Sequence, residues 1–177
     1  MKTNIRSILF PSVMSLAFLA FAALAQPRTT PPSAQAAFDK IKTLAGEWRG
    51  TIGERGKGEE TTVAYRLIAG GSALAETLFP GTPHEMITVY HRDGDKLLVT
   101  HYCAAGNQPT LALTKKSTAD TLDFYFIRAT NMKSKKESHM HSLRIRFEGA
   151  DAIVTEWDGY KEGRKTETTK FFLARKS

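Results

Sequence analysis

The sequence predicts an all-β fold: an antiparallel up-and-down barrel of about ten strands, preceded by one short N-terminal helix. From Glu47 onward apolar residues alternate with polar ones at a period of two, and turn signals recur about every ten residues. Helical periodicity does not return after that point. Strands that follow one another without long crossovers form a meander, and closing the meander into a barrel removes its two exposed edges.

Length and composition indicate one globular domain. The chain has 177 residues, of which 41% are hydrophobic and 24% are charged, so it is too apolar for a disordered chain. Its single cysteine, Cys103, excludes an intrachain disulfide framework and a cysteine-rich zinc module. The sequence contains neither a Gly-x-Ser-x-Gly elbow nor a Walker-type glycine loop. The sequence therefore does not decide whether the protein is an enzyme, but it favours a non-enzymatic protein.

Residues 1–25 have the features of an export signal. Lys2 and Arg6 form a short positive start, a long apolar stretch follows, and Ala23-Leu24-Ala25 provides a cleavage site before Gln26. We therefore expect a periplasmic or secreted protein with no stable membrane anchor after cleavage, and an uncleaved anchor is the alternative. An exported chain rarely meets nucleic acid, so we expect no nucleic-acid partner despite the formal charge of +7.

A linker and a helix precede the strands. Residues 26–35 are polar and contain three prolines, which predicts an extended linker. The domain that follows, residues 36–177, opens with apolar residues three positions apart, and this spacing predicts a short helix over 36–44. Gly46 ends that helix, which we expect to pack against the barrel or to plug it.

Two kinds of loop join the expected strands. The loops after the even-numbered strands are mostly tight turns such as Asp93-Gly94-Asp95, whereas those after strands three, five, seven and nine are longer and richer in Pro, Asn and charge. Successive loops of an up-and-down barrel alternate between its ends, so one end is expected to be sealed and the other to form a ligand-binding mouth. The expected strands are 47–53, 60–68, 73–79, 85–92, 96–103, 109–115, 121–128, 139–148, 152–158 and 164–174.

Four of the five histidines map to the expected mouth. His84 lies in a mouth loop, and His101 lies just before another, near the end of the fifth strand. His139 and His141 open the eighth strand and share a face with its apolar residues. Because the apolar face must point inward, we expect both of these imidazoles to point into the barrel.

Three further side chains complete the expected ligand site. Glu76 shares the apolar face of the third strand, where an unpaired carboxylate would be costly. We therefore expect a hydrogen bond or an ion pair, with a histidine or Arg128 as the candidate partner. Trp157 and Phe79 lie near the mouth and are expected to form an aromatic wall. The candidate ligand-binding residues are His84, His101, His139, His141, Glu76, Trp157 and Phe79.

Three interpretations of this group remain open. The leading hypothesis is a non-enzymatic barrel that binds a small, partly apolar molecule as its partner, with polar side chains orienting the ligand. The second is a divalent metal or haem as cofactor, with or without catalysis. The third is a structural module whose cavity is filled by its own side chains. The candidate metal ligands are His101, Cys103, His139 and His141.

Three segments carry a family resemblance: LAGEWRG (44–50), residues 69–109 and HMHSLRIRF (139–147). Together they resemble a group of uncharacterised secreted bacterial proteins, over nearly all of the mature domain. This resemblance implies a lipocalin-like fold within the calycin group and implies no activity. The Leu-x-Gly-x-Trp-x-Gly opening, Leu44 to Gly50, is also similar to that of nitrobindin-type ten-stranded barrels, which implies haem as a candidate cofactor. The Tyr-Pro stretch that follows in those barrels has no counterpart here.

Overall fold

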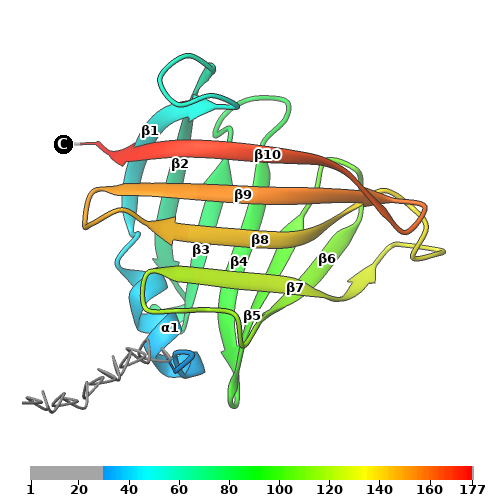
Figure 1. Ribbon diagram of the computed structural model, residues 1–177, viewed down its shortest axis with the longest axis horizontal. Coiled ribbons are helices and arrows are strands. Elements are labelled where there is room, and N and C mark those ends of the chain that lie inside the picture. The colour runs from blue at the N-terminus through cyan, green and yellow to red at the C-terminus, as the bar shows by residue number, and fades with distance from the viewer. Residues whose placement is uncertain (1–29, 177) are drawn as a thin grey trace, which may run out of the picture.

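The ten strands close into one antiparallel barrel. The computed structural model describes residues 30–176, so the predicted export signal, its cleavage site and the first part of the predicted linker lie outside the described residues. Each strand pairs with its neighbours in sequence, and the first pairs with the last to close the barrel (Figure 1). The predicted ten-stranded up-and-down barrel is therefore confirmed. Within residues 30–176, no helix has the length and apolar character needed to cross a membrane.

The observed strands lie close to their predicted ranges. The largest difference is at the end of the ninth strand, which continues further toward the mouth than the alternation indicated. The seventh strand also ends later than predicted, and the sixth ends earlier. The elements are α1 (Ala34–Lys42), β1 (Gly46–Ile52), β2 (Glu59–Ile68), β3 (Ala73–Leu78), β4 (Met86–Asp93), β5 (Lys96–Tyr102), β6 (Gln108–Leu113), β7 (Thr121–Thr130), β8 (His139–Phe147), β9 (Ala152–Lys161) and β10 (Arg164–Arg175), with a 3-10 turn over Ala69–Gly71.

Helix α1 plugs the end of the barrel that carries the tight turns. It begins two residues before the predicted start because the side chain of Ser33 caps it, accepting a hydrogen bond from a first-turn amide at 3.1 Å. Phe38 and Ile41 are buried in the barrel core. Lys40 Nζ lies 4.7 Å from the centre of the Phe147 ring, at the end of β8. The loop-fringed end is therefore left as the mouth.

The LAGEWRG segment joins this plug to the barrel wall. Trp48 is 0% exposed, and its Nε1 donates a hydrogen bond to the carbonyl oxygen of Leu44 at 2.8 Å. Gly46, between them, has a φ of 131°, which favours glycine. A Cβ atom on Gly50 would lie 1.8 Å from the carbonyl oxygen of Phe172 on β10. One glycine thus turns the chain from helix into strand, and the other lets β10 approach β1.

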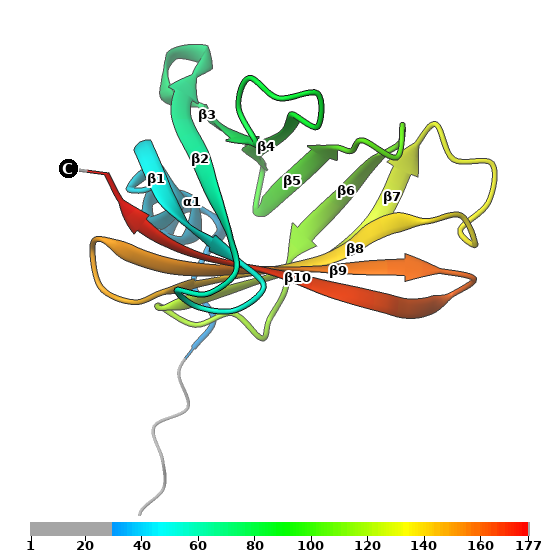
Figure 2. The same cartoon turned by 90° about the horizontal axis from the view of Figure 1, so that it is seen from above.

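Strands β7 and β8 separate toward the mouth (Figure 2). Their pairing ends at Tyr125 opposite Ser142, although both strands continue beyond these residues. β8 also shifts register against β9 between Met140 and Ser142, where His141 is the extra residue. Such a bulge breaks the strict alternation of side chains. The first residues of β8 therefore do not follow the alternation set by the rest of the strand.

Candidate functional site

A mostly apolar pocket of about 140 Å³ lies inside the mouth half of the barrel. Its two nitrogen-bearing side chains are His101 of β5, which is 1% exposed, and Trp157 of β9, and their ring centres lie 4.7 Å apart. Phe79, which follows β3, also lines the pocket, as the sequence predicted for a mouth aromatic. The complete lining is Leu78, Phe79, Met86, His101, Met140, Trp157, Thr169 and Phe171.

A row of hydrogen-bonded side chains holds the His101 ring at its Nδ1 atom. Tyr65, Glu76, Thr88 and His101 lie directly opposite one another across β2 to β5. The Tyr65 hydroxyl donates to Glu76 at 2.7 Å, and Tyr90 donates to the other carboxylate oxygen at 2.9 Å. The Thr88 side chain also bonds Glu76, and its oxygen lies 3.0 Å from Nδ1 of His101. The row thus connects a buried carboxylate to the imidazole.

This row selects the tautomer of His101. An ionised carboxylate only accepts hydrogen bonds, so with Glu76 ionised the Thr88 hydroxyl donates to it. The Thr88 oxygen then accepts the Nδ1–H of His101, and the proton on this ring is placed at Nδ1. Nε2 is consequently the nitrogen that carries a lone pair.

Two ring nitrogens at the pocket are buried and unpaired. Nε2 of His101 and Nε1 of Trp157 have no hydrogen-bond partner within residues 30–176. Leaving a buried polar atom unpaired costs about 1–3 kcal/mol. Burial also lowers the pKa of His101 from 6.5 to about 4, so its imidazole is uncharged at neutral pH. These two side chains therefore offer one strong acceptor and one donor beside mainly apolar walls.

Glu76 is satisfied by hydroxyl groups. It is 0% exposed, and no ion pair joins it to a cation within residues 30–176. Burial raises the pKa of Glu76, against the opposing effect of hydrogen bonds from Tyr65, Tyr90 and Thr88. The predicted hydrogen bond is confirmed, but the expected histidine or Arg128 partner is wrong. Hydroxyl groups from neighbouring strands stabilise the carboxylate without bringing a second charge into the core.

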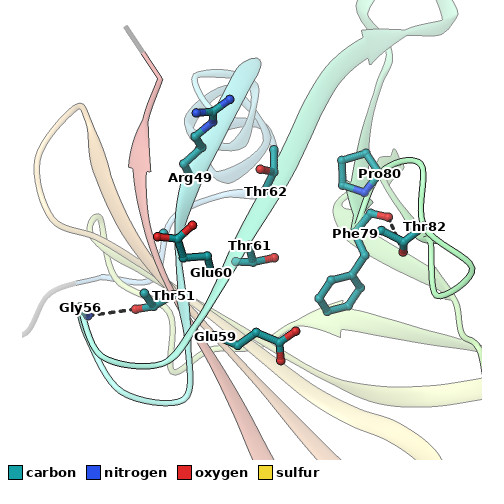
Figure 3. A pocket seen from close by; sticks show the side chains of 11 residues that line it. Arg49, Thr51, Gly56, Glu59, Glu60, Thr61, Thr62, Phe79, Pro80 and Thr82 are labelled. Carbon is teal, nitrogen blue, oxygen red and sulfur yellow. Dashed lines mark hydrogen bonds between the residues drawn. The ribbon is translucent and has the colours of Figure 1, made fainter.

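A wider, polar groove of about 790 Å³ opens at the rim beside the pocket. Figure 3 shows Glu59 and Thr61 of β2 extending toward Phe79, which lines both the groove and the pocket. Phe79 has a φ of 55°, in the left-handed region, and its ring centre lies 5.9 Å from that of Phe171. This backbone conformation is unusual for an aromatic residue, and here it begins the turn that follows β3. Phe79 therefore stands between the pocket and the open groove.

His139 and His141 lie outside the pocket, in the gap between β7 and β8. Met140 lines the pocket in their place. Nε2 of His139 lies 3.0 Å from Nδ1 of His141, and the His141 ring stacks on Tyr160 with centres 4.0 Å apart. His139 is buried and His141 is half-buried, but neither lines the pocket, because the bulge at His141 interrupts the alternation that the prediction extended from Leu143.

The remaining predicted residues do not join the pocket. His84 is exposed in the β3–β4 loop, and Cys103 is half-buried; neither lines the pocket. Among residues 30–176, no group of three or more His, Cys, Asp or Glu side chains is placed to hold a metal ion. The predicted ligand set of His101, Cys103, His139 and His141 is therefore not assembled. That prediction is wrong because His101 and Cys103 lie on and just after β5, whereas His139 and His141 lie on β8 in another part of the wall.

Sequence reasoning missed part of the site, although one signal was available. Asp93 pairs with Lys96 across a two-residue hairpin loop. Counting back from that turn places Thr88 opposite His101, which would have identified the hydroxyl partner. No comparable signal marks Met140, because it reaches the pocket through an irregular strand start. The missed residues are Tyr65, Leu78, Met86, Thr88, Tyr90, Met140, Thr169 and Phe171.

Comparison with known proteins does not assign the chain to a family. No protein-family model matches the chain, and no curated protein matches it significantly. Membership of a lipocalin-like family therefore stays a prediction. The evidence that bears on function is the chemistry of the pocket.

Proposed function

We propose that this protein is an exported, non-enzymatic barrel that binds a small, partly apolar molecule in its mouth pocket. The observation that carries the proposal is the Nε2 atom of His101, which is buried without a hydrogen-bond partner in the described chain. A ligand O–H or N–H group would satisfy this nitrogen, and the apolar lining would hold the rest of the molecule. The indole N–H of Trp157 offers a second polar contact.

The volume of the pocket itself accommodates about one ring. An apolar cavity of about 150 Å³ is known to bind benzene, and this pocket has about 140 Å³. Haem does not fit beside His101 with the lining in this arrangement, because its four-ring macrocycle is much larger than the cavity. A pocket with two unpaired nitrogens also argues against a structural module with a filled core.

Export and family membership belong to the same proposal. The positive start, apolar stretch and Ala-x-Ala site support a periplasmic or secreted location. A barrel with one plugged end and a pocket at the other supports a place among the lipocalin-like proteins that the sequence resembles. The hydrogen-bonded row behind His101 supports binding, because it fixes the orientation of the imidazole before any ligand arrives.

Titration calorimetry with phenol and benzene tests the binding site. The two molecules differ by one hydroxyl group, so the preference for phenol measures the hydrogen bond to His101 Nε2. We expect phenol to bind wild-type protein about tenfold more tightly than benzene, the size of an ordinary buried hydrogen bond. His101→Leu is expected to remove this preference, and the exposed His84→Ala is the matched control.

Two outcomes would contradict the proposal: failure of both molecules to bind, or a phenol preference that survives His101→Leu. Native mass spectrometry of protein purified from the organism that encodes it addresses the natural ligand. A retained molecule of about one ring, lost in the His101→Leu variant, is the expected result. Thermal melts of each variant establish that the barrel is still folded.

A further inference from the structure

Two methionines line the mouth pocket together with His101, whose Nε2 is buried without a partner in the described chain. Met86 at the start of β4 and Met140 of β8 line the pocket together with His101 of β5. Both methionines also pack against the hydrophobic core. We propose that these three side chains form a site for one soft monovalent metal ion, Cu(I). This inference goes beyond the proposed function, because the site needs no organic ligand and would compete with one for Nε2.

The donor atoms have the chemistry that Cu(I) selects. Thioether sulfur is a soft ligand that favours Cu(I), and a neutral imidazole is a good ligand for copper. The hydrogen bond from Nδ1 toward Thr88 leaves Nε2 of His101 as the coordinating nitrogen. Nε2 is also the buried atom that lacks a partner in the described chain, so binding a metal would satisfy it.

The surroundings favour a single positive charge. The pocket lining contains no carboxylate and no thiolate side chain, so a hard dication would lack the anionic ligands that it normally requires. The cost of burying an ion rises steeply with its charge, which favours Cu(I) over Zn²⁺ in these apolar walls. The Trp157 ring, which also lines the pocket, presents a π-system that attracts a cation.

The row behind His101 would act as the outer shell of the site. Metal-binding histidines commonly donate their second N–H to an acceptor that fixes the ring and raises its basicity. Here that acceptor is the Thr88 oxygen, and Thr88 is bonded in turn to Glu76. An ionised Glu76 would supply the counter-charge for a monovalent ion, two hydrogen bonds away from the coordinating nitrogen.

Anaerobic titration with Cu(I) tests the site. Bicinchoninate, a chromogenic Cu(I) chelator, serves as the competitor, and we expect one Cu(I) ion per chain. The double variant Met86→Leu, Met140→Leu keeps apolar side chains of similar size and removes both sulfurs. We expect it to weaken Cu(I) binding at least about 100-fold, since outer-shell changes alone weaken metal sites by about 10–100-fold.

Three controls separate this site from other copper donors and from the proposed organic ligand. Met132→Leu changes a methionine outside the pocket, and Cys103→Ser removes the free thiol; both variants should bind Cu(I) like wild type. Titration of copper-free wild-type protein with phenol and benzene tests the organic site separately, because it involves no metal and no change to the pocket lining. Loss of the copper site alone is thereby distinguished from loss of the organic site.

The inference is overturned if the double methionine variant binds Cu(I) like wild type, if Cys103→Ser abolishes binding, or if Zn²⁺ binds as tightly as Cu(I). X-ray absorption of the wild-type complex keeps the test decisive when a variant fails to fold. One nitrogen and two sulfur neighbours around copper support the site, whereas a shell of nitrogen and oxygen alone overturns it.

Discussion

At the end of the barrel plugged by α1, two large polar side chains, Trp48 and Arg175, are hydrogen-bonded. The indole N–H of Trp48 donates to Leu44, and the guanidinium of Arg175 donates to two carbonyl groups of the α1–β1 connection at 2.7 and 2.9 Å. At the mouth, the equally buried ring nitrogens of His101 and Trp157 have no partner in the described chain. The same barrel thus holds one tryptophan with a satisfied N–H and one without.

This difference separates the roles of the two ends. Arg175 also lies over Trp48, with its guanidinium carbon 4.5 Å from the ring centre, so the plug, β1 and β10 are held together by one packed and bonded group. The mouth keeps unpaired atoms that a stability-optimised core would not contain. Substitutions at the plugged end should therefore lower stability, and those at the mouth should mainly alter binding.

The largest expected effect is at the plugged end. Trp48→Ala is predicted to lower the free energy of unfolding by about 3–5 kcal/mol, because it removes a fully buried aromatic ring and leaves a cavity. Phe79→Ala is the matched change at the mouth, where the ring already borders a pocket. Urea titrations of both variants check the contrast. Equal losses would show that the mouth is packed for stability as tightly as the plug.

The second-largest expected effect is the pH dependence of stability that is caused by His101. Its folded pKa of about 4 lies below the ordinary 6.5, so the stability it contributes is present above pH 6.5 and is lost as the pH falls toward 4. A shift of this size corresponds to about 3 kcal/mol. Urea midpoints at pH 7.5 and pH 4 should show this loss in wild type relative to His101→Leu. Parallel pH profiles for the two proteins would contradict a buried neutral imidazole.

A smaller loss is expected from the carboxylate behind the pocket. Glu76→Gln replaces two accepting oxygens with one, so the hydroxyls of Tyr65 and Tyr90 compete for it. The predicted cost is about 1–3 kcal/mol in the free energy of unfolding, the cost of one unpaired buried group. Adding Tyr65→Phe to Glu76→Gln should recover part of this loss in a double-mutant cycle. Strictly additive losses would mean that the hydroxyl is not bonded to Glu76.

The raised pKa of Glu76 has the opposite pH signature to that of His101. The stabilisation from a protonated Glu76 is present below the ordinary pKa of 4.5 and is lost as the pH rises through the folded value. Comparison of Glu76→Gln with wild type across this range isolates that contribution. Glu76 and His101, which are both buried in this row, therefore respond to pH in opposite directions.

The fold could be predicted from the sequence because its signals are local. Alternation at a period of two and recurring turns predict the strands, and the order of the loops predicts which end carries the tight turns and which end is the mouth. The inward phase of His101 also follows from alternation with Leu97 and Val99, both 0% exposed. These features need no information about neighbouring strands.

The rest of the site could not be predicted by alternation alone. Alternation gives the face of a side chain but not its neighbours, so Thr88 was not connected to His101. It also fails wherever a bulge inserts one residue, and β8 carries such a bulge at His141. Met140 therefore occupies the inward place expected for the histidines.

The smallest expected effect lies in the gap between β7 and β8. His141→Ala removes a ring that stacks on Tyr160 and Phe126, with centres 4.0 and 5.2 Å apart. Aromatic pairs contribute about 0.5–1.5 kcal/mol beyond their buried area, and a loss of that order is predicted in urea titrations at pH 7.5. Phenol affinity should stay unchanged, because His141 does not line the pocket.

The same variant also sharpens the contrast with His101 through its pH dependence. Burial, followed by the neighbouring His139, lowers the pKa of His141, against a smaller opposing effect of Asp158. The stabilisation from His141 is thus present above pH 6.5 and declines as the pH falls, so wild type and His141→Ala should converge in stability toward acid pH. A tenfold loss of phenol affinity in His141→Ala, with little change in stability, would instead place this imidazole at the ligand and move the site from the β5 side of the mouth to the β8 side.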